Sequence, residues 1–223
     1  ERRRTPPPSL PGWFEAHLTL ALGGGGAVLI WTSIHPSRGH AEQVCLVWPS
    51  GASPIVMIED DIPIPAKRWE FRTSGLWVEQ VCEKPLDHWS YGLEAFALEL
   101  DNPTELLQTG YGTRVPMGWE LDFVGNEEAR WLLTIGEPLE RAGAYSQKGS
   151  MEGLLLGGGD DVPFEGLAQR WHWWGTTPLS GAGIRTTITD EQLMELHLPL
   201  SQGPVVVRRS STVLLVESAA TIS

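Results

Sequence analysis

The amino-acid sequence predicts an all-β protein in which about eleven or twelve strands form an antiparallel meander. Three observations indicate this fold class. Most segments alternate apolar and polar side chains, as strands do. Short loops rich in Gly, Pro, Asp and Ser separate these segments. No segment carries apolar residues that recur at the helical period of 3.6 residues. Such sheets hide their edges by closing into a barrel or by packing as a sandwich.

The first half of the chain supplies the first six predicted strands. The glycines at 23–26 interrupt the first alternating segment, as expected of a hairpin loop. Segment 59–67 is extended, but Pro63 and Pro65 make it unsuited to a central strand, because proline donates no ladder hydrogen bond. The six strands cover residues 13–22, 27–33, 42–48, 54–58, 76–83 and 89–100.

The second half of the chain supplies six more predicted strands, with tight turns at 157–160 and 189–190. Residues 104–108 and 127–133 could each form a short helical turn. The strands cover residues 113–124, 144–156, 162–174, 183–189, 192–198 and 205–217.

The domain organisation follows from length and local composition. Residues 1–10 join a run of three arginines to a run of three prolines, which predicts a disordered leader. Residues 11–223 are expected to form one β domain with a possible subdivision near residue 110, since all-β domains often exceed 200 residues.

Charge and hydropathy limit the partners. A net charge of −12 argues against nucleic acid, which requires a basic surface. No stretch has the length and apolarity of a membrane span, and no signal peptide is recognisable. A soluble cytoplasmic protein, monomeric or homodimeric, is therefore expected.

Cysteine and histidine usage indicates neither a disulfide framework nor a metal centre. Cys45 and Cys82 lie in apolar segments and are expected to be small buried residues, although a single bridge between them is possible. His35 and His40 share a loop, but no cluster has metal-ligand spacing. No metal and no dedicated cofactor are expected.

The densest chemistry lies at residues 166–175, GLAQRWHWWG. Because side chains alternate along a strand, Arg170, His172 and Trp174 should share one face, and Trp171 and Trp173 the other. A cation, an imidazole and an indole on one strand face suggest that these side chains line a ligand-binding cavity.

Three motifs in chain order resemble those of one family. Residues 112–121, GTRVPMGWEL, resemble a G-x-R-x-P-x-x-x-D/E-L strand. Residues 145–153, YSQKGSMEG, resemble the Y-x-Q-x-x-x-x-x-G strand that follows it, and 166–175 is similar to G-x-G-x-R-D-H-x-W-G. The family is that of the carotenoid 1,2-hydratase-like proteins with lipocalin-like domains, which includes actinobacterial members and related Diels–Alderase-type cyclases.

The resemblance implies a lipocalin-like barrel or a pair of half-barrels that holds isoprenoid, steroid or polyketide-like molecules. Arg170, His172, Trp174 and Gly175 match the last motif. Trp171 stands where the family has Asp, so the local carboxylate that a hydratase mechanism needs is absent.

Three residues are candidate catalytic groups. His172 could shuttle a proton near neutral pH, and Arg170 could bind a carbonyl, enolate or carboxylate oxygen. The alternative is an Arg–carboxylate bridge inside a barrel, with the histidine held by a backbone carbonyl. Glu94 is either a buried acid beside Phe96 or a solvent-facing residue on the outer sheet.

A further set of candidates could bind substrate. The tryptophans could stabilise a carbocation through their faces, or they could simply pack. His17 is either a cavity residue or an ordinary core or surface histidine. The candidates are Trp171, Trp173, Trp174, Gln169, His17, Tyr145 and Trp119.

Together these features predict a cofactor-independent enzyme that acts on a hydrophobic small molecule, by cyclisation, isomerisation or hydration in a barrel pocket. The alternative is a non-catalytic protein that binds a lipid or pigment.

Overall fold

The computed structural model describes residues 11–66, 69–101, 112–132, 141–156, 161–176, 181–185, 194–198, 205–210 and 213–218. Within these residues the chain forms only strands and turns, all strand pairings are antiparallel, and no helix occurs. The predicted all-β class is therefore confirmed. The described residues accordingly contain no helix that could cross a membrane.

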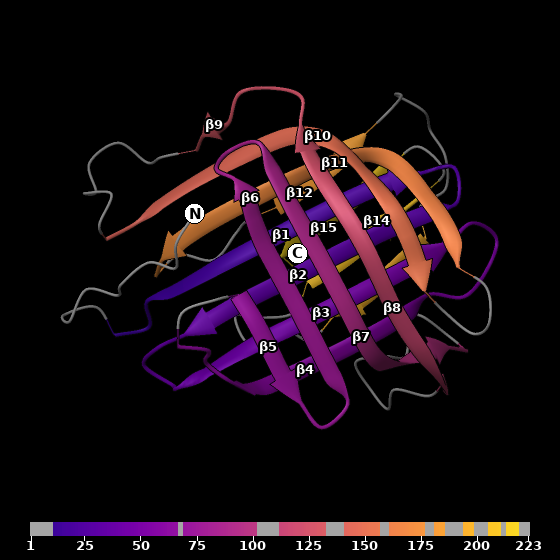
Figure 1. The fold of residues 1–223 in the computed structure, drawn as a ribbon, viewed down its shortest axis with the longest axis horizontal. Coiled ribbons are helices and arrows are strands. Elements are labelled where there is room, and N and C mark those ends of the chain that lie inside the picture. The colour runs from indigo at the N-terminus through magenta and orange to yellow at the C-terminus, as the bar shows by residue number, and fades with distance from the viewer. Residues whose placement is uncertain are drawn as a thin grey trace.

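The larger of two sheets has eleven strands and closes on itself. Its order is β4-β3-β2-β1-β11-β10-β8-β7-β6-β5, and a pairing of β4 with β7 completes a ring of eight strands. The short strand β9 (Arg130–Trp131) pairs with β10 outside this path. In Figure 1 strands β5–β8 cross in front of β1–β4, as expected of a barrel. The remaining bounds are β1 (Phe14–Gly23), β2 (Gly26–His35), β3 (His40–Pro49), β4 (Ile55–Pro63), β5 (Trp69–Thr73), β6 (Leu76–Lys84), β7 (His88–Leu100), β8 (Gly112–Gly125), β10 (Gly143–Leu156) and β11 (Val162–Gly175).

The barrel wall has a seam between β4 and β5. Strand β7 pairs with β6 from His88 to Ala95, and only its far end reaches β4, through Ile55–Glu99 and Val56–Leu98. The hairpin β5–β6 occupies the space beside β4, yet β4 and β5 share no hydrogen-bonded ladder among the described residues. Met57 and Ile62 of β4 nevertheless belong to the same buried cluster as Phe71 of β5.

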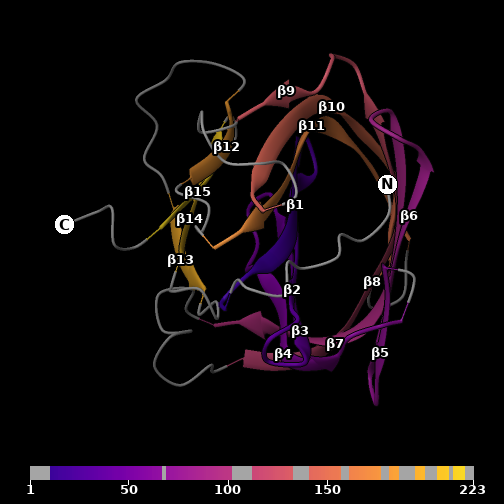
Figure 2. The same ribbon diagram turned by 90° about the vertical axis from the view of Figure 1, so that its left-hand side faces the viewer.

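A second sheet covers one side of the barrel. Its four strands are β12 (Gly181–Arg185), β15 (Val213–Ser218), β14 (Val205–Arg209) and β13 (Met194–Leu198), in that order. Figure 2 shows this sheet alongside β1 and β2. Val207 and Leu214 belong to one buried cluster with Leu18, Leu29 and Leu46 of the barrel. As a result, β1 and β2 are buried on both faces.

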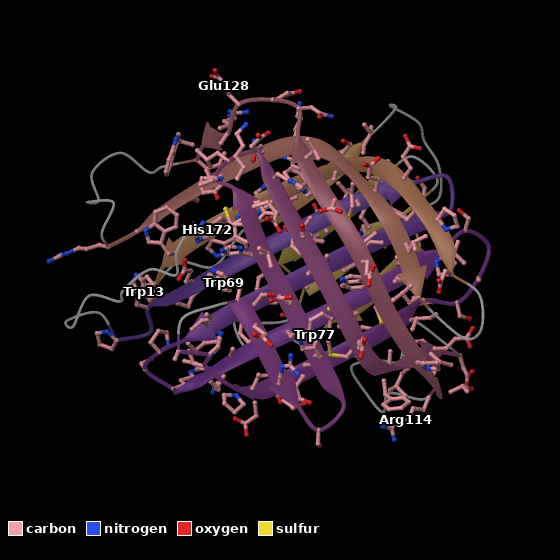
Figure 3. The ribbon with its side chains drawn as sticks, in the orientation of Figure 1. Trp13, Trp69, Trp77, Arg114, Glu128 and His172 are labelled. Atoms are coloured by element: carbon pink, nitrogen blue, oxygen red, sulfur yellow. The ribbon has the colours of Figure 1, made fainter. Side chains whose placement is uncertain are left out.

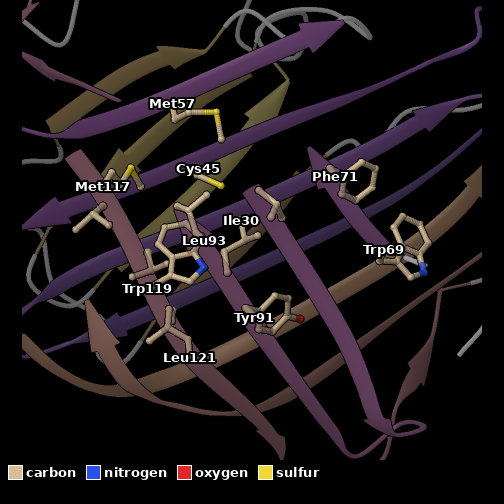
Figure 4. Close-up of a cluster of buried hydrophobic side chains, with 14 of the residues drawn as sticks. Ile30, Cys45, Met57, Trp69, Phe71, Tyr91, Leu93, Met117, Trp119 and Leu121 are labelled. Carbon is tan, nitrogen blue, oxygen red and sulfur yellow. The ribbon is translucent and has the colours of Figure 1, made fainter. Parts of the chain in front are cut away.

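The middle of the barrel is filled by side chains. Figure 4 shows Ile30, Leu93 and Trp119 together between the walls, with Tyr91 beside them. Interdigitated packing of this kind gives the interior a rigid frame, against which polar groups can be held.

Two local predictions are wrong. Residues 127–132, the described part of the segment 127–133, do not form a helical turn, because Arg130 and Trp131 pair with Ser146 and Tyr145 in the sheet. Segment 205–217 is not one strand but the hairpin β14–β15, in which Ser210 donates its N–H to the carbonyl of Val213. The predictions for 1–10 and 104–108 lie outside the described residues.

Two further features depart from the expected pattern. Segment 59–67 begins as the second half of β4, which pairs with β3 as far as Pro63, and β5 was missing from the predicted strands. Cys45 and Cys82 are free thiols, so the bridge left open by the sequence does not form. Burial raises the pKa of Cys45 to about 12, which keeps this thiol protonated.

Candidate functional site

The candidate site forms where β1 and β11 pair. The register sets His17 directly opposite His172 and Thr19 opposite Arg170. On the far side of β11, His172 faces Tyr145 of β10. Neighbouring side chains on one face of such a ladder lie about 5 Å apart, so three strands converge at His172.

Glu15 and His172 form a buried polar contact that joins β1 to β11. The Glu15 Oε1 and His172 Nε2 atoms lie 2.9 Å apart, and both side chains are almost fully buried, with exposures of 1% and 2%. Glu15 precedes His17 by two residues and therefore projects from the same face of β1. A buried carboxylate is thus held against the imidazole in a position to orient it and to exchange a proton with it.

The His17 ring packs between the ring of His172 and the indoles of Trp69 and Trp89. Its ring centroid is 4.1 Å from that of His172, 4.2 Å from Trp69 and 5.3 Å from Trp89. Trp69 comes from hairpin β5–β6, which lines the seam. Figure 3 shows Trp69 and His172 on the same side of the molecule. The indole N–H groups of Trp69 and Trp89 are buried, and neither has a hydrogen-bond partner among the described residues.

Arg170 is the fully buried cation of the site, with an exposure of 0%. Its Nη1 donates to the hydroxyl of Tyr145 at 2.9 Å, and its guanidinium carbon lies 4.0 Å from the ring centroid of Trp89. A cation over an indole face is attracted by the ring quadrupole, which partly offsets the cost of burial. Arg170 and Tyr145 together offer donors to an electron-rich oxygen.

Aromatic side chains close this end of the barrel. Trp13, Tyr145 and Trp174 form one buried cluster, and Trp131 packs across its outside at 5.5 Å from Tyr145 and 6.4 Å from Trp174. Gly143 stands opposite Trp174, and a Cβ there would lie 2.3 Å from the indole, so only glycine allows this close approach.

The structure separates the two faces of β11 as the alternation predicted. Arg170, His172 and Trp174 face inward, whereas Trp171 and Trp173 lie in the cluster under the second sheet. Gln169 also lies on the outer face, where it is half-buried. Of the predicted substrate-binding residues, His17, Tyr145 and Trp174 are therefore brought to His172, and Trp171, Trp173 and Gln169 are not.

Two other predicted residues lie elsewhere. Trp119 is buried in the middle of the barrel beside Leu93 and is part of its packed core (Figure 4). Of the two alternatives that the sequence left open for Glu94, the structure bears out the solvent-facing one, so this candidate catalytic residue is not a buried acid. It is exposed on the outer face of β7, because Leu93 and Ala97 occupy the inward positions.

Glu15, Trp69 and Trp89 belong to the site but were not among the residues predicted from the sequence. Glu15 and His17 form a Glu-x-His pattern on one strand face, which could have drawn attention to the pair. Their relation to His172 depends on the pairing of β1 with β11, which no local pattern reveals. Glu15, His17 and His172 each offer one ligand atom, and these atoms lie within 4.8 Å of one another.

Two hollows lie near the barrel wall. A cleft of about 560 Å³ follows the seam, between Met57 and Glu59 of β4, the β5–β6 turn at Gly75, and Phe96. A more apolar cavity of about 320 Å³ lies at the end of the barrel where β1 stops, away from Glu15. Its lining includes Val47, Ile55, Val115, Met117, Leu155 and Val162.

These elements define the molecule as an antiparallel barrel with a buried cluster of acid, base and cation at one end. Comparison of the chain with family models, curated proteins and solved structures finds no match. The resemblance to carotenoid 1,2-hydratase-like proteins therefore stays a prediction.

Proposed function

We propose that this protein is an enzyme that converts a hydrophobic, oxygen-bearing small molecule, of isoprenoid, steroid or polyketide type, without a dedicated organic cofactor. The observation that carries the proposal is the buried Glu15–His172 pair at 2.9 Å, next to the buried Arg170. The reaction is a cyclisation, isomerisation or hydration, because transfer of a proton and polarisation of a substrate oxygen can lower the barrier to reactions of these types.

Each side chain has a role in this proposal. Arg170, together with the Tyr145 hydroxyl, polarises a carbonyl or enolate oxygen. His172 moves the proton, and Glu15 orients its ring and stabilises the charged form. Glu15 thereby supplies, from β1, the carboxylate that is missing where Trp171 replaces the family's Asp.

The cost of burying these groups supports a functional role. Burial of an arginine, a glutamate and two histidines in the barrel is unfavourable, and an apolar cluster of the same size would be as stable or more stable. Titratable groups placed in this way are concentrated at functional sites. The indole N–H groups of Trp69 and Trp89 add donors that a bound oxygen could satisfy.

The seam provides the route for a substrate. The cleft lies between β4 and the β5–β6 turn, two segments that share no hydrogen-bonded ladder among the described residues. Hairpin β5–β6 is held by the ladder between β6 and β7 and by none with β4, so a movement of β5 that carried Trp69 away from His17 would break no ladder with β4. The lining of the cleft mixes apolar residues such as Met57, Leu76 and Phe96 with Glu59, Asp61 and Arg114, which suits a hydrophobic molecule that also bears oxygen.

The first experiment identifies the molecule. Native mass spectrometry of freshly purified protein should reveal a co-purified hydrophobic compound, and incubation with that compound or its precursors should give a product of altered mass or altered retention. Arg170→Met, His172→Gln and Glu15→Gln should each lower turnover at least about 100-fold.

Matched controls separate chemistry from folding. Arg72→Met and His88→Gln change the same residue types at positions outside the site, where Arg72 bonds Glu70 and His88 bonds Asp122. Both should keep turnover within about twofold, as is usual for surface substitutions. Full turnover in both Arg170→Met and His172→Gln would contradict the proposal.

The apolar cavity favours a second candidate function, a non-catalytic lipid- or pigment-binding protein. A volume of about 320 Å³ is at the lower end of the range for small-molecule sites. This candidate predicts a ligand retained without change of mass, and a binding affinity weakened by Leu155→Glu but not by His172→Gln. The two candidates are thus separated by which variant affects the bound compound.

A further inference from the structure

We infer that Glu15, His17 and His172 form a binding site for one divalent transition-metal ion, with Zn²⁺ and Co²⁺ as suitable probes. The inference goes beyond the proposed reaction, because the binding of an ion is measured without any substrate.

The geometry of two strands brings the three ligands together. Glu15 and His17 project from one face of β1, and His172 is the direct cross-strand partner of His17. One ligand atom from each lies within 4.8 Å of the other two, and the Glu15 Oε1 to His172 Nε2 distance is 2.9 Å. Ligands about 2.1 Å from a metal ion are about 3.0–3.4 Å apart at octahedral or tetrahedral angles. Small side-chain rotations would therefore bring the set to bonding distance.

The chemistry of the ligands selects the class of ion. Two imidazole nitrogens and one carboxylate oxygen suit zinc, iron, cobalt or nickel, whereas magnesium and calcium prefer oxygen ligands alone. Three protein ligands leave room for water or another oxygen, as in open metal sites.

Burial and packing preorganise the three side chains for binding an ion. All three side chains are at most 2% exposed, so their loss of hydration is already part of the folded structure. Trp69 and Trp89 pack against His17, and Tyr145 and Trp174 against His172, which fixes the rings on two sides. Ligands held in this way need little ordering when an ion arrives.

The positive charge of Arg170 is expected to weaken the binding of a metal ion at this site. Its guanidinium bonds the Tyr145 hydroxyl, and the Tyr145 ring lies 5.4 Å from that of His172, so a second cation would sit within one side chain of the first. Arg170→Met should therefore tighten metal binding at least about tenfold, because it removes a buried like charge. An adventitious surface site would not respond to this variant.

An ion held between Glu15 and His172 takes the place of their hydrogen bond. The ion-loaded protein could not use this pair to move a proton, so the ion and the proposed reaction exclude one another. Zn²⁺ is thus expected to suppress the turnover attributed to His172, although its binding does not depend on that turnover.

The test measures binding by the full chain after removal of metal with a chelator. Calorimetric titration should show one Zn²⁺ per chain. Glu15→Gln and His17→Gln should each weaken binding at least about tenfold, in line with the loss of one ligand. His40→Ala is the matched control, because His40 and His35 form a second close histidine pair among the described residues, with centroids 5.4 Å apart. It should bind Zn²⁺ as the unchanged chain does.

A second measurement keeps the inference testable if a variant does not fold. X-ray absorption of the unchanged chain loaded with Zn²⁺ should show two imidazole ligands, and the Co²⁺ form should absorb visible light as a site of low coordination number does. Absence of stoichiometric binding by the unchanged chain, a site without imidazole, or loss of binding in His40→Ala would each overturn the inference. None of these results depends on turnover, so they leave the proposed reaction to its own test.

Discussion

The two faces of β11 carry opposite chemistry and meet opposite surroundings. The inner face places Arg170 and His172 against Glu15 and Tyr145 inside the barrel. The outer face places Trp171 and Trp173 in an apolar cluster with the second sheet. A single strand thus separates a polar site from an apolar interface by the thickness of one backbone.

Closing a barrel does not by itself decide which face of its strands is apolar. The second sheet removes water from the outside of β1, β2 and β11, so the outer face gains hydrophobic stabilisation there. The inner face can then carry polar groups at one end without loss of the fold. We expect outer-face substitutions to change stability and inner-face substitutions at the site to change function.

The largest effect is expected on the outer face, from Trp173→Ala. Trp173 is 3% exposed and packs edge-on against Trp31, with ring centroids 5.1 Å apart, and against Phe14 at 6.5 Å. Removal of a buried indole leaves a cavity and should lower the free energy of unfolding by about 3–5 kcal/mol. Urea denaturation followed by circular dichroism measures this loss.

Trp131→Ala is the control for this prediction. Trp131 is 47% exposed and contacts other rings only at its edges, so its removal should cost about 1 kcal/mol or less. Equal losses in the two variants would contradict the assignment of the outer face as the structural one.

The next effect concerns pH and a histidine on the outer face of β2. Burial, followed by the charges of His40 and Arg38, lowers the pKa of His35 from 6.5 to about 4. As the pH falls from about 6.5 to about 4, the unfolded chain takes up a proton that the folded chain does not, so stability is lost over this window. The loss should approach about 3 kcal/mol, and it should not grow further below about pH 4.

Unfolding free energies measured at several pH values test this dependence. His35→Gln removes the titrating group and should flatten the profile between about pH 6.5 and about pH 4. If the free energy of unfolding of His35→Gln still falls with pH as in the unchanged chain, another group causes the loss of stability.

A smaller effect is expected on the inner face at Thr32. Its hydroxyl donates to Gln43 Oε1 at 2.6 Å and accepts from Gln80 Nε2, in a buried chain that ends at Cys45. Thr32→Val keeps the shape but leaves both amides short of a partner, and should cost about 1–3 kcal/mol. Thr32→Ser retains the hydroxyl and should recover most of this loss in the same urea measurement. A fully stable Thr32→Val would show that water or another group satisfies both amides.

Much of the fold could be predicted from the sequence, because alternation and turns are local signals. Strand positions from 13 to 174 were largely correct. The hairpin at 210 was missed because Val205–Arg209 and Val213–Ser218 lack Gly or Pro between them. Strand β5 was missed because its five residues are too few to show a period.

The site was predicted only in part, because half of it comes from distant strands. The alternation in 166–175 placed Arg170 and His172 on one face, and the structure bears out that placement. The acidic partner was sought on β7, where Glu94 alternates with apolar residues, yet it lies on β1. Strand register decides this choice, and register depends on how the whole sheet closes.

The smallest effect is therefore expected at Glu94, on the solvent side of β7. Its inward neighbours Leu93 and Ala97 fill the barrel, and its own side chain is exposed opposite Trp77 and Gly118. Glu94→Gln should change the free energy of unfolding by less than about 0.5 kcal/mol, as surface substitutions usually do. It should also leave metal binding and turnover unchanged, whereas Glu15→Gln should lower both. Measurement of the two variants side by side decides which carboxylate belongs to the site, and equal losses would show that the inner and outer faces of the barrel are not separated in function.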